Sequence, residues 1–97
     1  MSDEDTLSEE LLLLVRMTVG KRIRQTRIDL GLSQRAIASD AGVHQTDWSR
    51  IERGLIDPRL STLLRIQHSL GLEGLEILFG SLPSRRFVEE SATDNAS

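Results

Sequence analysis

The sequence predicts an all-α protein that folds as one compact domain. No segment alternates apolar and polar side chains with an enrichment in β-branched residues, so no strand is expected. Capping residues precede several stretches whose apolar side chains recur at helical spacing, and glycines follow these stretches. A length of 97 residues is typical of a single domain. These observations predict a compact bundle of five helices.

The first expected helix is long. Thr6 followed by Glu9 is a capping-box pattern, the helical pattern runs over residues 7–30, and Gly31 is expected to end it. At 100° per residue, one stripe of this helix faces the core. The stripe consists of Leu12, Val19, Ile23, Arg27 and Leu30. Because Arg27 would then lie on a buried face, it needs a partner of opposite charge.

Four shorter helices are expected to follow the long one. They are expected over residues 34–41, 44–53, 62–70 and 72–79. Ser33 and Ser61 are good N-caps for the first and third of them, and Gly42 allows a tight turn between the first and second. The last of them is expected from its apolar content alone.

The chain divides into three expected parts. Residues 1–18 form an acidic N-terminal extension with a leucine-rich helical segment, and residues 19–80 form the compact domain. Residues 81–97 are polar and rich in Ser, Glu, Asn and Asp, so they are expected to be a disordered tail.

Composition excludes several classes of function. The chain has no cysteine, which excludes a disulfide framework, a thiol nucleophile and a cysteine-ligated zinc site. We expect no metal and no cofactor. Neither His44 nor His68 has the neighbours of a catalytic triad, and there is no glycine-rich phosphate loop, so an enzyme is not expected. The longest apolar run, residues 11–15, is too short for a membrane span, which needs about 20 residues. We therefore expect a cytoplasmic protein that binds no membrane.

Charge is distributed unevenly along the chain. The net charge is −3, but residues 16–68 contain ten basic and five acidic side chains, and both ends of the chain are acidic. A basic centre attracts the phosphates of a nucleic-acid duplex. The solvated surface of ordinary helices carries similar charges, so charge alone leaves both interpretations open.

The segment 33–54 combines a capped short helix, a glycine turn and a second helix with two different sides. Trp48 and Ile51 fix the inward side, and Glu52 lies beside them as the natural partner for Arg27. The outward side carries only polar side chains and one sign of charge. Its residues are Gln45, Thr46, Ser49, Arg50 and Arg53. Such a surface fits the major groove of DNA, where Gln pairs with adenine and Arg with guanine.

Residues 19–80 resemble the lambda-repressor-like (Cro-type, XRE) family of helix-turn-helix proteins. The matching groups include Leu32-Ser33-Gln34, Ala41-Gly42-Val43 and Ile51-Glu52-Arg53-Gly54. The resemblance implies a five-helix bundle, double-stranded DNA as the ligand, a dimer, and an ion pair between Arg27 and Glu52. Trp48 departs from the family, which usually has Ile or Val at that position, so the core must accommodate a larger ring.

The resemblance also implies roles for individual residues. Those implied to read bases are Gln45, Thr46 and Arg50. Those implied to contact phosphates are Ser33, Gln34, Ser49, Arg53 and Arg59. Two residues at the start of the same helix have two interpretations each. His44 either touches a phosphate or only begins the helix, and Asp47 either favours the helix dipole or selects a base.

Two apolar surfaces remain. Leu7, Leu11 and Leu14 face away from the core stripe, so either the helix breaks near residues 18–20 and folds back, or these leucines form a self-association surface. In family members the last helix often contributes to the dimer contact. By resemblance, a two-fold interface is therefore placed at Leu72, Leu75, Leu78 and Phe79. A two-fold dimer presents its reading helices about 34 Å apart and prefers a palindromic site.

Two functions from different classes are compatible with these features. The first is a sequence-specific regulator of transcription, a repressor or autoregulator, that binds a palindromic operator in double-stranded DNA as a homodimer. The second is a protein-interaction module that holds a protein partner through its leucine surfaces, which the acidic ends favour. Salt separates the two hypotheses, because DNA binding weakens steeply with salt and a leucine contact does not.

Overall fold

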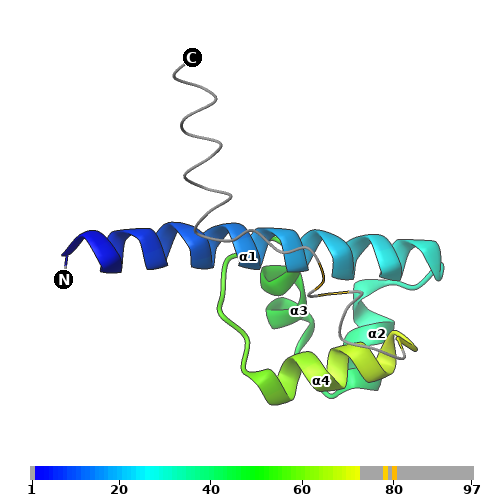
Figure 1. The fold of residues 1–97 in the computed structure, drawn as a ribbon. Coiled ribbons are helices and arrows are strands. Elements are labelled where there is room, and N and C mark those ends of the chain that lie inside the picture. Colours follow the sequence, from blue (N-terminus) through cyan, green and yellow to red (C-terminus); the bar gives the residue numbers. More distant parts are fainter. Residues whose placement is uncertain (1, 73–77, 79, 81–97) are drawn as a thin grey trace.

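Four helices make up the described part of the chain. The computed structural model describes residues 2–72, 78 and 80, with side chains from residue 9 onward. The helices are α1 (Ser2–Asp29), α2 (Gln34–Ala41), α3 (Gln45–Glu52) and α4 (Leu60–Ser69). These residues contain no strand, and none of their helices is long and apolar enough to cross a membrane. α1 packs on α3, and α2 packs on both α3 and α4, so the short helices cluster along the C-terminal part of α1 (Figure 1).

The prediction of five helices is wrong, because the structure has four in its described residues. The fifth was predicted from apolar content, which indicates burial and does not by itself indicate a helix. Gly71, with φ 72°, ends the helical path after α4. Leu78 is fully buried, and its carbonyl oxygen accepts a hydrogen bond from Arg22 of α1 at 2.9 Å. The rest of that segment, residues 73–77 and 79, lies outside the described residues.

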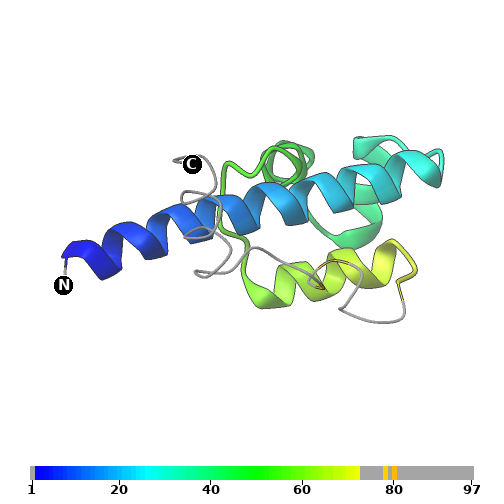
Figure 2. The same cartoon turned by 45° about the horizontal axis from the view of Figure 1, so that its top comes forward.

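The first helix is unbroken. The interpretation in which the chain breaks near residues 18–20 is therefore wrong. Gly20 lies inside α1 where it meets α3. A methyl group built on Gly20 would lie 2.5 Å from the carbonyl oxygen of Glu52 and would overlap that of Ile51. Gly20 thus permits close packing and makes no turn. The N-terminal part of α1 projects beyond the other helices (Figures 1 and 2).

Local capping positions the two helices of the helix-turn-helix. The Ser33 hydroxyl oxygen accepts a hydrogen bond from the backbone N–H of Ala36 at 3.0 Å, so Ser33 is the N-cap of α2, as predicted. Gly42 ends α2 with φ 70°, a left-handed conformation that favours glycine. His44 is the N-cap residue of α3 and makes no side-chain capping bond. The predicted cap Ser61 lies inside α4, which begins after Arg59.

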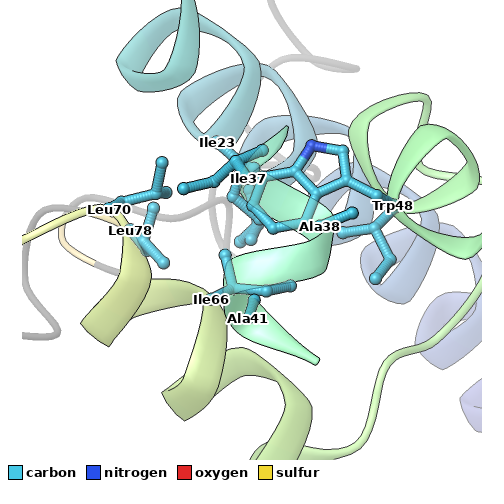
Figure 3. Packing of buried hydrophobic residues seen from close by; sticks show 10 residues of the cluster. Ile23, Ile37, Ala38, Ala41, Trp48, Ile66, Leu70 and Leu78 are labelled. Carbon is cyan, nitrogen blue, oxygen red and sulfur yellow. The ribbon is translucent and has the colours of Figure 1, made fainter. Parts of the chain in front are cut away.

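The core lies where the four helices meet. Figure 3 shows the ring of Trp48 among Ile23, Ile37 and Ala38, and Trp48 is fully buried. Burying one large apolar side chain stabilises a fold by about 1.5–3 kcal/mol. The buried apolar residues are Val19, Ile23, Ile37, Ala38, Ala41, Trp48, Ile51, Ile66, Leu70 and Leu78. They include Trp48 and Ile51, which the sequence predicted for the inward side of α3.

Two members of the predicted core stripe on α1 are not buried. Leu12 is 40% exposed and Leu30 is 51% exposed, whereas Val19 and Ile23 between them are buried. The stripe is longer than the cluster of short helices that covers it. A helical pattern therefore predicts which side of α1 faces the core, but not how far along α1 the core extends.

Candidate nucleic-acid interface

A buried carboxylate fixes the inward side of α3. Glu52 is 4% exposed and accepts hydrogen bonds from three side chains. Arg27 donates from Nε to Oε2 at 2.6 Å and from Nη2 to Oε1 at 3.0 Å. Gln34 donates from Nε2 to Oε1 at 3.0 Å, and Trp48 donates from Nε1 to Oε2 at 2.5 Å. One carboxylate therefore joins α1, the start of α2, and α3.

Hydrogen bonding keeps this carboxylate charged. Burial alone would raise the pKa of Glu52, but the hydrogen bonds from Arg27, Gln34 and Trp48 outweigh burial and lower the pKa below its ordinary value. The pKa of Arg27 is raised, chiefly by its hydrogen bond to Glu52. Arg27 also donates from Nη1 to the carbonyl oxygen of Leu32 at 2.9 Å, which anchors the turn before α2.

The outward side of α3 is open to solvent. Gln45, Thr46 and Arg50 are exposed. An open hollow lies between the start of α2 and the outward side of α3, and five of the predicted contact residues line it. They are Gln34, Gln45, Thr46, Ser49 and Arg53. Arg53 donates from Nε to the carbonyl oxygen of Ser49 at 3.3 Å, which holds its guanidinium along the edge of α3.

Arg50 lies outside the lining of this hollow and faces an acid of its own helix. Its Nη1 is 3.7 Å from Oδ1 of Asp47, and both side chains are about half exposed. An exposed pair of this kind contributes only about 0–1 kcal/mol to stability. His44 and Asp47 line a second hollow together with Thr62 and Arg65 of α4. Two predicted contacts remain, Ser33 at the start of α2 and Arg59 at the start of α4, and both are exposed.

The residues predicted for a dimer interface fall into three groups. Leu11 and Leu14 are half-buried on α1. Leu72 packs against the core and Leu78 is fully buried in it, so both contribute to the fold of the single chain. The side chains of Leu7, Leu75 and Phe79 lie outside the described residues.

Sequence reasoning missed two of the three donors to Glu52. Gln34 was assigned to phosphate and Trp48 to the core, yet both also bond the carboxylate. Trp48 and Glu52 stand four residues apart, a spacing that brings side chains together on a helix, so this contact had a signal in the sequence. Within the part of the chain that the structure describes, no group of three or more potential ligands could hold a metal ion.

Known proteins resemble this chain in sequence. Residues 18–77 match the family model of a helix-turn-helix domain. A protein of Haemophilus influenzae named an uncharacterized HTH-type transcriptional regulator is 37% identical over 57 residues, which are 59% of this chain and 58% of that protein. The match thus spans less than two thirds of that relative. The control protein C.BamHI of Bacillus amyloliquefaciens is 31% identical over 65 residues, 66% of this chain and 80% of that protein.

Solved structures resemble it in fold. The restriction-modification controller protein C.AhdI from Aeromonas hydrophila has a TM-score of 0.61 at 29% identity, over 64% of this chain and 94% of that one. The hypothetical transcription factor NHTF from Neisseria has a TM-score of 0.62 at 25% identity, over 78% of this chain and 84% of that one. The clp gene regulator ClgR from C. glutamicum has a TM-score of 0.59 at 25% identity, over 87% of this chain and 95% of that one.

Proposed function

Because the chain belongs to the helix-turn-helix family of DNA-binding transcriptional regulators, which are not enzymes, we propose that it binds a palindromic operator in double-stranded DNA as a homodimer. The observation that carries this proposal is the hollow between α2 and α3, where five polar side chains gather beside a helix whose other side is locked in place. A dimer seated on a promoter excludes polymerase, so we expect a repressor or an autoregulator.

Three exposed side chains of α3 read base edges in this proposal. The Gln45 amide can bond an adenine edge at two points, and the Arg50 guanidinium can fork onto a guanine. Thr46 offers a methyl group to a thymine. Glu52 supports these roles because it fixes the rotation of α3 about its own axis, so the three side chains enter the groove together.

Residues around the hollow hold the DNA backbone. Ser33 and Gln34 begin α2, where free backbone N–H groups attract a phosphate oxygen. Gln34 has one amide N–H bonded to Glu52, which leaves its second N–H to face the DNA. The other residues proposed to contact phosphates or flanking DNA are His44, Asp47, Ser49, Arg53 and Arg59.

The homodimer of this proposal associates through the N-terminal part of α1. That part projects beyond the other helices in both views (Figures 1 and 2). Its leucines are too apolar to be left in water: Leu12 and Leu13 are exposed, and Leu11 and Leu14 are half-buried. A two-fold pair of chains would read two half-sites related by the same symmetry.

Selection from a randomised duplex pool, followed by sequencing, tests this function. We expect enrichment of a palindrome with half-sites about one DNA turn apart. Repeating the selection at higher salt should weaken binding with a slope of about −0.9 per phosphate neutralised. A triple variant, Gln45→Ala with Thr46→Ala and Arg50→Ala, should lose the enriched sequence while retaining its fold, because all three side chains are exposed.

The matched control replaces Lys21 with Ala on the exposed outer face of α1, which removes a positive charge away from α3. This variant should enrich the same palindrome. If the folded wild-type chain enriches no sequence at low salt, the regulator hypothesis fails. Capture of a protein partner through the exposed leucines would then be the hypothesis to pursue.

A further inference from the structure

One side of the projecting part of α1 carries four residues at helical spacing. Glu9, Leu12, Leu13 and Arg16 stand at positions i, i+3, i+4 and i+7, which places them along one stripe, named here the E9–R16 stripe. Glu9 is exposed, and Leu12 and Leu13 are 40% and 44% exposed. The stripe continues the side on which Val19 and Ile23 are buried. Ile51 of α3 and Leu63 of α4 border its C-terminal end beside Arg16, and the part of α1 before that end projects beyond the short helices (Figures 1 and 2).

Arg16 gives this stripe an unsatisfied donor. Its Nε is buried and has no hydrogen-bond partner, and no carboxylate of the described residues lies within 4 Å of its guanidinium. A buried donor without an acceptor destabilises the fold. Arg16 also lines an apolar hollow of about 60 Å³ together with Leu12, Val15 and Ile56. The unpartnered donor and the apolar hollow therefore lie side by side.

The stripe is complementary to a second copy of itself that runs in the opposite direction. When a second α1 runs antiparallel across it, centred between Leu12 and Leu13, Glu9 of each chain meets Arg16 of the other and the two leucines meet each other. Two-fold symmetry requires this self-complementary pattern. We propose that a second copy of this chain docks on the E9–R16 stripe and places the Glu9 carboxylate on the unpaired Arg16. This inference rests on the self-association included in the proposed function. It places that contact on the side of α1 that carries Leu12 and Leu13, opposite the side that carries Leu11 and Leu14.

The surroundings of the stripe set the angle between the two helices. Residues 9–13 and 12–16 form ridges of the i, i+4 kind, and such ridges interlock when helices cross at about 50°. The loop containing Ile56 and Pro58 borders the hollow beside Arg16. An inclined crossing would carry the second α1 away from this loop.

Charge reversal tests the contact. We expect either Glu9→Arg or Arg16→Glu to weaken the dimer about tenfold or more in sedimentation equilibrium of the full chain. Each change puts two like charges opposite each other at both of the symmetry-related contacts. An equimolar mixture of the two variants should form a heterodimer of near wild-type affinity, since both cross-chain pairs are then complementary. A purely intrachain role for either residue cannot be rescued by mixing. Circular dichroism and thermal unfolding of each variant check that it has folded.

The matched control is Glu10→Arg, which makes the same charge change one residue away, on the outward side of α1. It should leave the dimer unchanged. A wild-type chain that stays monomeric, single variants that dimerise normally, or a mixture that fails to recover would each overturn the proposed interface. Enrichment of a DNA sequence by the same samples is scored separately, so a failed interface and a failed DNA-binding function are distinguished.

Discussion

The two sides of α3 differ in how strongly they are constrained. On the inward side, Trp48 and Ile51 are buried and Glu52 is bonded to three side chains from three helices. On the outward side, Gln45 and Thr46 are exposed, and the described structure gives their side chains no hydrogen bond to another residue. Eight residues of helix thus contain both a fixed anchor and a free surface.

This difference separates stability from recognition. A change on the inward side disturbs packing that the whole fold shares, whereas a change on the outward side leaves the fold intact and alters what α3 presents. A helix organised in this way can take on new outward side chains without a cost in stability. The following predictions test that separation, beginning with the largest effect.

Removing the anchor should cost the most. Glu52→Ala removes the carboxylate that pairs with the guanidinium of Arg27, a side chain that is only 12% exposed. It also leaves the side-chain N–H donors of Gln34 and Trp48 without their acceptor. We expect the free energy of unfolding to fall by about 3–5 kcal/mol. Urea unfolding followed by circular dichroism measures the loss. An unchanged midpoint would mean that the inward side is not the anchor of the fold.

Acid should weaken the same anchor in a graded way. The pKa of Glu52 is lowered in the folded chain from an ordinary value of 4.5. A carboxyl with a depressed pKa stabilises the fold fully above its unfolded pKa and loses that contribution as pH falls through the folded pKa. Stability should therefore decline below about pH 4.5. Glu52→Gln should flatten this part of the profile, and an identical slope in both proteins would assign the acid sensitivity to other carboxyl groups.

Changing a reading residue should leave the fold intact and affect recognition. Arg50→Ala is expected to relax the preference at one base pair by about 1–3 kcal/mol, with little change in thermal stability, because the side chain is half exposed. Competition between the enriched duplex and its single-base variants measures the effect. Equal weakening on every sequence would instead make Arg50 a phosphate contact. Lys21→Ala is again the matched control.

The smallest effect is expected at Asp47, which pairs with Arg50 on the same helix. Asp47→Asn removes the acid that lies 3.7 Å from Arg50, and stability should change by no more than about 0.5 kcal/mol. Removal of a negative charge from the proposed DNA face should raise affinity for random duplex, by up to about fivefold at low salt. Fluorescence anisotropy with a labelled random duplex measures this. Unchanged affinity for random duplex would place Asp47 away from the phosphates.

Local signals predicted most of the fold. The cap at Ser33 and the glycine at position 42 predicted the bounds of α2, and the helical pattern predicted the buried side of α3. These features depend on residues close together in the sequence. The residues proposed to contact DNA that share the hollow, such as Gln45 and Ser49, were also predicted from the outward side of one helix and the start of another.

Features that depend on distant residues were not predictable in the same way. Gly20 looked like a possible break because its reason, the backbone of α3 at its surface, lies more than 30 residues away in the sequence. The fifth helix was expected because burial of Leu78 and helix formation have the same apolar signature. The bond from Gln34 to Glu52 required the distance between α2 and α3, which no pattern supplies.

The position of Trp48 has a consequence for optical spectroscopy. It is the only tryptophan of a chain that has no tyrosine, so nearly all near-ultraviolet absorbance and intrinsic emission arise from one indole. That indole is fully buried and donates its N–H to the Glu52 carboxylate. The emission colour and lifetime of the unlabelled protein therefore report on the junction of α1, α2 and α3. Any event that loosens this junction becomes visible without a dye.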